Sequence, residues 1–354
     1  MNKLHIPPLD EQAAKAALEH QKILAKPPLA LGKLEPVAIR IAAMTGNPAP
    51  RLKDKAVVLF AADHHIADHG LSLTSTDVTY IQTRNFLQGG GTINAFTRNA
   101  GARLSVVDVG VNYDFGDLPG LVKRKVMHGA NDFSKEPAMT REQALECLQV
   151  GIDMAREEKN KGLDIVAAGE MGIGNTTTSS AVAAVLLGQP VELMTGRGAG
   201  LSDEGLARKV DAICRGILCN EPDPEDTLDV LAKLGGFDIA GLCGVFLGGA
   251  LAGVPVLALP ARGGRFYDWE NNGMPDAAAR LLHEGKIQLF CADSIDGESL
   301  LAGNESPRRR AEMQEKYFVY LTSELAARIA ELNAPESKEK PLIWCVGVDT
   351  GAYQ

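Results

Sequence analysis

The 354-residue sequence is poor in aromatic residues (5%), and it contains no basic run longer than three residues and no long apolar segment without proline. A formal net charge of -9 without a longer basic cluster argues against nucleic acid or an anionic membrane as a partner, because both attract clustered positive charge. No apolar stretch that is free of proline reaches the ~18 residues of a transmembrane helix. The start of the chain also lacks a signal-peptide core. We therefore expect a globular, cytoplasmic protein that binds neither membrane nor nucleic acid.

The sequence has six cysteines but no C-x-x-C pair. Most of them stand in apolar runs, which is typical of reduced thiols in a core and not of disulfides or metal ligands. The six are Cys147, Cys214, Cys219, Cys243, Cys291 and Cys345.

A turn rich in glycine and hydroxyl residues joins an apolar strand, predicted over 163–168, to a helix predicted over 181–187. Gly172 and Gly174 leave the backbone accessible to a ligand, and the hydroxyl residues before the helix are suited to cap it. The unpaired N–H groups at the helix start attract anions. Glu170, just before the turn, would face the same ligand. The pattern predicts a phosphate site, although such a turn is equally typical of an ordinary connector.

A second glycine-rich segment, Thr195 to Leu201, surrounds Arg197 and precedes a helix predicted over 205–210 that carries Lys209. Arginine binds phosphate through a bidentate fork and lysine through a point charge, so both side chains are candidate phosphate ligands. The alternative for either residue alone is a solvated helix face.

The remaining pattern alternates helices and strands. Helices are predicted over 10–24 and 34–44, a strand over 56–61, a helix from near Thr92 and a strand over 104–111. Strands separated by helices indicate an α/β fold with a doubly wound, mainly parallel sheet, whose ligand sites lie at the carboxyl ends of the strands.

A polar loop follows the first of these strands and contains Asp63, His64, His65, Asp68 and His69. Imidazole and carboxylate groups at such spacing can chelate zinc or manganese. They can equally donate hydrogen bonds to, or accept them from, a heteroaromatic ring or a ribose. No further ligand set is evident in the sequence, so we interpret the loop as lining a substrate site and predict no metal.

These motifs together resemble the nicotinate-nucleotide:dimethylbenzimidazole phosphoribosyltransferases over residues ~1 to 254. The segments that carry the resemblance are Ala62-Asp63-His64, Asn85-Phe86-Leu87-x-Gly89-Gly90-Gly91-x-Ile93-Asn94, Val107-Asp108-Val109-Gly110-Val111, Glu170-Met171-Gly172-Ile173-Gly174-Asn175-Thr176-Thr177, Gly196-Arg197-Gly198-x-Gly200-Leu201 with Lys209, and Gly235-Gly236-Phe237-Asp238-Ile239-Ala240. The resemblance implies a doubly wound sheet with a small helical lobe, a homodimer, and a reaction that needs no metal or cofactor.

In that reaction a benzimidazole nitrogen displaces nicotinate from C1′ of nicotinate mononucleotide. The resemblance implies that Glu170 stabilises the sugar cation or shares in proton removal, and that Ser72 belongs to the pocket for the aromatic base. It also implies a set of residues that bind the phosphate and other parts of the substrates. These are Asp63, His64, Gly172, Gly174, Asn175, Thr176, Arg197, Lys209 and Asp238.

The resemblance ends after Leu257. Family members continue with Asp-Gly-Phe, Ser-Ala-Glu and Leu-Gly-Glu-Gly-Thr-Gly elements, the last of which holds the principal base, and none of these is present as such. Residues ~255–354 resemble the N-terminal part of an esterase of the α/β-hydrolase type. Aligned on the transferase loop, the base glutamate is Val348 and its neighbour is Asp349; aligned on an esterase elbow, Asp349 stands at the nucleophile serine. We take Asp349 as the second candidate catalytic residue.

The sequence is thus divided into a helical segment of the small lobe (1–50), a nucleotide-binding α/β core (51–257) and a C-terminal α/β segment (258–354). The function that we expect is transfer of phosphoribose from nicotinate mononucleotide to 5,6-dimethylbenzimidazole or a related aromatic base, with catalysis impaired by the altered base motif. The first alternative is a non-catalytic nucleotide-binding subunit that needs a partner chain. The second is an esterase-like hydrolase.

Overall fold

The structure, a computed structural model, describes residues 6–257 except 28 and 33, together with 287–288 and 342–343. Within them, five parallel strands form one sheet in the order β3-β2-β1-β4-β5, and two further strands pair with each other. The strands are β1 (Lys55–Ala62), β2 (Ala102–Gly110), β3 (Leu121–Lys123), β4 (Ile165–Met171), β5 (Val256–Leu257), β6 (Ile287–Gln288) and β7 (Leu342–Ile343). The predicted parallel sheet is confirmed.

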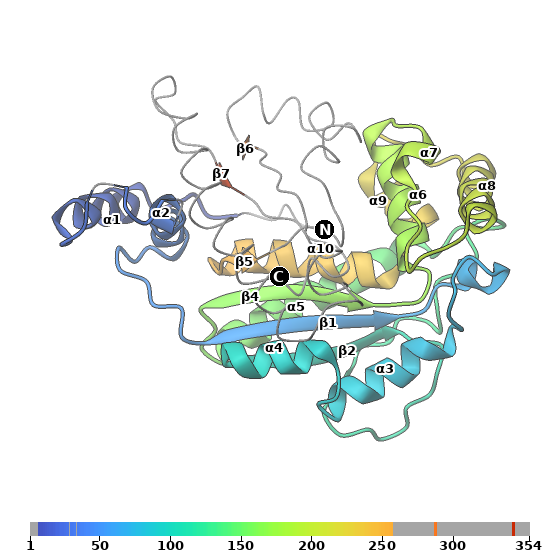
Figure 1. Cartoon of the computed structure of the whole chain (residues 1–354), viewed down its shortest axis with the longest axis horizontal. Coiled ribbons are helices and arrows are strands. Elements are labelled where there is room, and N and C mark those ends of the chain that lie inside the picture. Colours follow the sequence, from blue (N-terminus) through green and yellow to red (C-terminus); the bar gives the residue numbers. More distant parts are fainter. Residues whose placement is uncertain (1–5, 28, 33, 258–286, 289–341, 344–354) are drawn as a thin grey trace, which may run out of the picture.

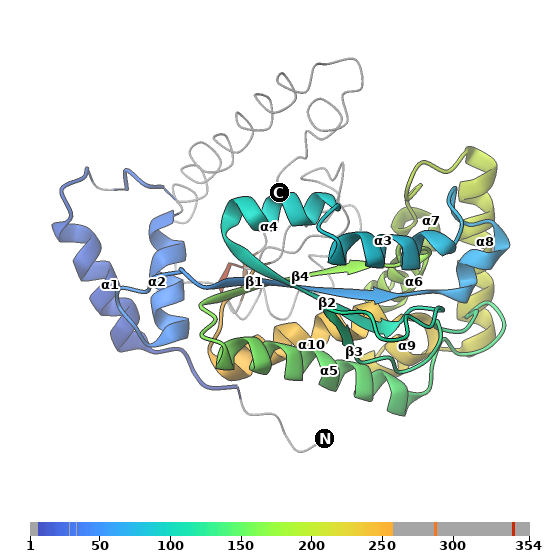
Figure 2. The same cartoon turned by 90° about the horizontal axis from the view of Figure 1, so that it is seen from below.

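Helices cover both faces of the five-stranded sheet, as a doubly wound fold requires. In Figure 2, α3 (Asp77–Leu87) and α4 (Thr92–Ala100) lie on one face, and α5 (Arg141–Asn160) and α10 (Phe237–Ala252) lie on the other. The α/β class predicted from the alternating pattern is therefore correct.

Two helices lie at the amino ends of the strands, away from the rest (Figure 1). These are α1 (Glu11–Ile23) and α2 (Leu34–Thr45), which pack against each other. The Asp10 carboxylate caps α1 by accepting the Ala13 N–H at 2.9 Å. Both helices were predicted; the boundaries proposed for the three domains stay predictions.

At the opposite end, four helices gather beyond the carboxyl ends of the strands (Figure 1). They are α6 (Asn175–Leu187), α7 (Val191–Met194), α8 (Asp203–Asn220) and α9 (Thr227–Leu234). Ser202 caps α8 by accepting the Gly205 N–H at 3.2 Å. This cap fixes the start of the helix that carries Lys209.

The packing of α10 on α5 is unusually close because glycines face each other. A Cβ on Gly151 would lie 2.1 Å from the carbonyl oxygen of Gly241, and a Cβ on Gly244 would lie 2.1 Å from that of Leu148. Any larger side chain would push the helices apart. This contact fixes where α10 begins, and its first turn carries Phe237 and Asp238 to the carboxyl ends of the strands.

The strand order reverses between β1 and β4. From β1 the chain proceeds to β2 and β3 on one side and then to β4 and β5 on the other. In doubly wound sheets, ligands bind at the carboxyl ends of the strands where this reversal occurs. The loop after β1 and the turn after β4 therefore border the expected crevice.

No helix in the described part of the chain is long and apolar enough to cross a membrane. Among the cysteines, Cys147 is buried, but Cys219 and Cys243 are exposed. The prediction of core thiols is therefore wrong for these two, because each lies on the outward side of a helix whose other face is buried. Cys291 and Cys345 lie outside the described residues.

Candidate active site

A cavity of about 210 Å³ lies at the carboxyl end of β4. Three segments far apart in the sequence line it: the stretch around Ser72, the turn after β4 and the glycine-rich loop before α8. The lining residues are Leu71, Ser72, Leu73, Thr74, Glu170, Met171, Gly172, Ile173, Gly174, Asn175, Thr176, Arg197, Gly198, Ala199 and Leu201. The structure thus brings most of the predicted site residues to one cavity.

The turn between β4 and α6 is tighter than the sequence suggested. Gly174 has a φ of 100°, in the left-handed region that favours glycine, and α6 begins directly after it at Asn175. The prediction that hydroxyl side chains cap a helix starting near 181 is therefore wrong. Thr178 and Ser180 instead donate back to the Asn175 and Thr176 carbonyl oxygens, both at 2.8 Å. Gly174 supplies no side-chain cap, and the Asn175 and Thr177 N–H groups donate to the Gly172 and Gly174 carbonyl oxygens at 3.2 and 2.8 Å.

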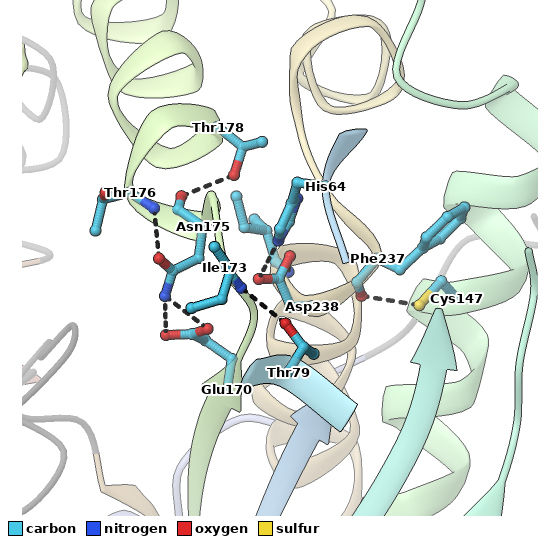
Figure 3. Close-up of polar contacts among 11 residues, drawn as sticks. His64, Thr79, Cys147, Glu170, Ile173, Asn175, Thr176, Thr178, Phe237 and Asp238 are labelled. Carbon is cyan, nitrogen blue, oxygen red and sulfur yellow. Dashed lines mark hydrogen bonds and ion pairs between the residues drawn. The ribbon is translucent and has the colours of Figure 1, made fainter. Parts of the chain in front are cut away.

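Asn175 is bonded to Glu170 (Figure 3). Its Nδ2 lies 2.8 Å from each carboxylate oxygen of Glu170, and its Oδ1 accepts the Thr176 N–H at 2.7 Å. The amide therefore orients the carboxylate from the first turn of α6. Sequence reasoning grouped Asn175 with the phosphate ligands and missed this contact.

Lys209 is buried, with 1% of its surface exposed. Its Nζ donates to Thr176 Oγ1 at 2.8 Å and to the Gly196 carbonyl oxygen at 3.1 Å. Burial lowers the pKa of Lys209 to about 8. With a pKa of about 8 most of the lysine is still protonated at pH 7, so its ammonium group can pair with an anion at the first turn of α6.

Arg197 and Ser72 lie at the rim of the cavity and are more exposed. The Arg197 guanidinium forms an ion pair with Asp203 and donates to the Leu201 carbonyl oxygen at 2.9 Å. Ser72 Oγ lies 3.2 Å from Thr74 Oγ1. Both side chains keep hydrogen-bonding capacity toward a ligand.

His64 and Asp238 lie behind the turn and do not line this cavity. Their side chains are completely buried, and His64 Nε2 lies 3.0 Å from Asp238 Oδ2 (Figure 3). Burial lowers the pKa of His64, but the Asp238 carboxylate together with Glu170 and Asp63 raises it, and the net direction is upward. The structure thus joins two predicted substrate ligands to each other.

Asp63 is also buried, and its Oδ2 accepts the Asn112 N–H at 2.8 Å. Burial raises the pKa of Asp63 despite this bond. With His64 and Tyr80 it borders a smaller cavity of about 50 Å³. Within the described ranges, no group of three or more His, Cys, Asp or Glu side chains is arranged to hold a metal ion.

The structure adds Thr79, which sequence reasoning did not single out. It is fully buried on α3, and its Oγ1 accepts the Ile173 N–H from the turn at 3.1 Å (Figure 3). Nothing in its local sequence marks it, because the contact depends on how α3 packs on the sheet. Asp349, the second candidate catalytic residue, lies outside the described residues, as does Val348.

The fold is that of a doubly wound α/β protein with a cavity where the strand order reverses, as in many α/β enzymes. Residues 6–258 match the family described as "Phosphoribosyltransferase", and the chain belongs to this family. The match agrees with the resemblance predicted over ~1 to 254. The esterase resemblance of residues ~255–354 finds no support in the comparisons, which favour the transferase over both alternatives.

Two similar proteins are named nicotinate-nucleotide--dimethylbenzimidazole phosphoribosyltransferase. The protein from Chloroflexus aggregans is 50% identical over 253 residues, 72% of each chain. The protein from Geobacter sulfurreducens is 48% identical over 250 residues, 71% of each chain. Among solved structures, CobT from Thermus thermophilus is similar with a TM-score of 0.66 and 42% identity, covering 70% of this chain and 74% of that one.

Proposed function

We propose that this protein transfers the 5-phosphoribosyl group of nicotinate mononucleotide to 5,6-dimethylbenzimidazole. A ring nitrogen of the acceptor forms a bond to C1′ while the bond between C1′ and the nicotinate nitrogen breaks, with inversion. The other acceptor nitrogen loses its proton, and the products are nicotinate and α-ribazole phosphate. The names of the similar proteins and the family membership support this proposal.

We assign the 5′-phosphate to the start of α6. The Thr176 hydroxyl and the buried Lys209 ammonium supply a donor and positive charge, and the positive end of the α6 dipole lies beside them. Gly172 lets the turn lie close against the end of β1, since a Cβ there would meet the Ala62 carbonyl oxygen at 2.3 Å. Arg197 at the rim can leave Asp203 to contact the phosphate, because an exposed ion pair costs little to break.

Glu170 is the residue that we assign to the sugar. The observation that carries the proposal is that this carboxylate and the phosphate-binding turn border one cavity, with Asn175 bonded to both carboxylate oxygens. A fixed negative charge next to C1′ stabilises an oxocarbenium-like transition state more than the ground state. Nicotinate leaves as its ring nitrogen loses positive charge.

Ser72 is assigned to the acceptor, since it lies on the segment that faces the turn across the cavity. Asp349 is proposed as the acceptor of the azole proton, because Val348 occupies the place of the family's base. We further propose that the protein acts as a cytoplasmic homodimer, as the resemblance to the family implies; light scattering of the purified protein tests the dimer.

The direct test is incubation of the purified protein with nicotinate mononucleotide and 5,6-dimethylbenzimidazole. Liquid chromatography with mass spectrometry should show nicotinate and α-ribazole phosphate in equal amounts, and no nicotinate without the acceptor. Release of nicotinate alone would indicate hydrolysis and contradict the proposal. Binding of the mononucleotide without turnover, with activity only after a complete homologue is added, would favour the non-catalytic subunit.

A further inference from the structure

The buried His64–Asp238 pair joins two distant parts of the site. His64 follows β1, and Asp238 lies in the first turn of α10, 174 residues further along the chain. Both side chains are 0% exposed, and their 3.0 Å contact is made by His64 Nε2 and Asp238 Oδ2. The Ile239 N–H donates to Asp238 Oδ1 at 2.8 Å, which fixes the carboxylate. The pair therefore ties the end of β1 to the start of α10.

Glycines surround the His64 ring. A Cβ on Gly172 would lie 2.9 Å from His64 Nε2, and a Cβ on Gly236 would lie 2.4 Å from its Cε1. Gly174 approaches the same residue, since its Cβ would lie 3.1 Å from that of His64. Side chains at these positions would displace the ring. The imidazole thus fills the space directly behind the turn that follows Glu170.

Three carboxylates act on the His64 ring. They come from three elements: Asp238 on α10, Glu170 on β4 and Asp63 after β1. Against the opposing effect of burial, they raise the pKa of His64. The ring therefore lies among the carboxylates of the site, on the side of the turn opposite to the cavity.

We propose that His64 and Asp238 form a positioning unit for the reaction, in which Asp238 holds the His64 ring behind the turn so that Gly172, Gly174 and Glu170 keep their arrangement at the cavity. The inference rests on the proposed function. It assigns these two residues a role through Glu170 and the turn instead of direct contact with substrate. Neither side chain borders the larger cavity, which agrees with that role.

The test compares Asp238→Asn with the parent enzyme. The asparagine keeps the size of the side chain but loses its charge. We expect kcat to fall at least tenfold while KM for nicotinate mononucleotide changes less than threefold. In a Glu170→Gln background the same substitution should change kcat less than twofold, because two residues that act through one another are not additive.

Glu158→Gln is the matched control, since Glu158 is equally a buried carboxylate with 1% side-chain exposure. It is paired with Arg103 and Lys161 near the start of β2, away from the cavity. We expect it to lower the melting temperature without changing kcat. If kcat of Asp238→Asn equals that of the parent, or falls equally in both backgrounds, the positioning role is wrong.

Hydrogen–deuterium exchange separates this inference from the proposed function, because it needs no turnover. The segment 170–176 should exchange at least tenfold faster in Asp238→Asn than in the parent, and at the parent's rate in Glu158→Gln. If segment 170–176 exchanges at the same rate in Asp238→Asn and in the parent protein, the inference is wrong. If the parent protein shows no turnover, only the proposed function is wrong. If Asp238→Asn does not fold, His64→Gln replaces it in both measurements, since it keeps a donor toward Asp238 but lacks the ring that fills the space behind the turn.

Discussion

Lys209 Nζ lies 2.8 Å from Thr176 Oγ1, so the middle of α8 reaches the first turn of α6. In the part of the chain that the structure describes, no carboxylate forms an ion pair with this ammonium, and its other contact is the Gly196 carbonyl oxygen. A buried cation without a counter-ion is costly for the fold and favourable for an anionic ligand. We therefore expect the charge of Lys209 to lower the stability of the free protein and to raise its affinity for an anion.

Replacing Lys209 with methionine should separate the two effects. Loss of a charge-assisted contact weakens binding of nicotinate mononucleotide by roughly 1.5–3 kcal/mol. The free energy of unfolding at pH 7 should rise by about 1–2 kcal/mol, because the cost of burying the charge is removed. Calorimetric titration and urea unfolding measure the two quantities. A destabilised variant that binds normally would show that Lys209 is structural.

The stability that Lys209→Met gains over the parent protein should shrink above pH 8. The pKa of Lys209 is lowered to about 8 from 10.5, so at higher pH the folded state releases a proton that the unfolded chain keeps. The unfolded state then binds more protons, and the stability of the parent rises with pH up to the unfolded pKa. Urea unfolding at pH 7 and pH 9 checks this, with Lys209→Met as the variant that lacks the effect.

The affinity of the parent protein for nicotinate mononucleotide should fall as pH rises, whereas its stability rises. The ammonium form of Lys209 is lost as pH rises through about 8, so Kd for nicotinate mononucleotide should rise about tenfold between pH 7 and pH 9. The phosphate does not cause this change, because its second pKa is about 6. Lys209→Arg, which stays charged, should give a flat profile over the same range. A parallel rise in both proteins would assign the effect to another group.

Glu170→Gln should lower the rate far more than the affinity. The substitution keeps the shape of the side chain but removes the charge that opposes the sugar cation, so kcat should fall by about 10²–10⁴. Kd for the mononucleotide should stay within a few-fold. Asn175→Ala, which frees the carboxylate from its 2.8 Å contacts, should give a smaller loss of kcat. Steady-state kinetics with titrations of each variant check this order, and parental turnover by the glutamine variant would make Glu170 structural.

The C-terminal base is tested by two substitutions with opposite expected effects. Asp349→Asn should lower kcat at least tenfold if Asp349 accepts the azole proton. Val348→Glu restores the family's carboxylate in the sequence and should raise kcat by a comparable factor. Both are measured at saturating concentrations of the two substrates. Two silent substitutions in a protein that binds the mononucleotide would exclude this segment from the reaction.

The positions of β1, β2, β4 and the turn after β4 could be predicted because their signals are local, whereas the three-residue strand β3 was not predicted. Apolar runs mark β1 and β4, and Glu170 follows the second run at its end. The start of α6 could not be predicted from its hydroxyl residues, since the left-handed φ of Gly174 decides it. The local sequence shows which residues can cap a helix, but it does not show at which glycine the backbone changes direction and the helix begins.

Contacts between distant segments could not be predicted. The pairing of His64 with Asp238 requires the close packing of α10 on α5, where Gly151 meets Gly241. The contact of Asn175 with Glu170 competes with the phosphate role that the turn suggested. Type and spacing of residues therefore identify the members of this site, while packing determines which of them act on one another.

Gly172→Ala tests whether the turn needs its close approach to β1. A Cβ there would lie 2.3 Å from the Ala62 carbonyl oxygen, which cannot move without distorting β1, and 2.9 Å from His64 Nε2. Such overpacking costs typically about 1–3 kcal/mol of stability, and we expect binding of the mononucleotide to weaken at least tenfold. Gly169→Ala is the matched control three residues earlier, because among the described residues no atom lies within 4 Å of its Cβ position. Thermal unfolding and titration of both variants measure the difference. Equal behaviour of the two alanines would show that the turn tolerates a side chain, and that the space behind it does not set the arrangement of Glu170 and the start of α6.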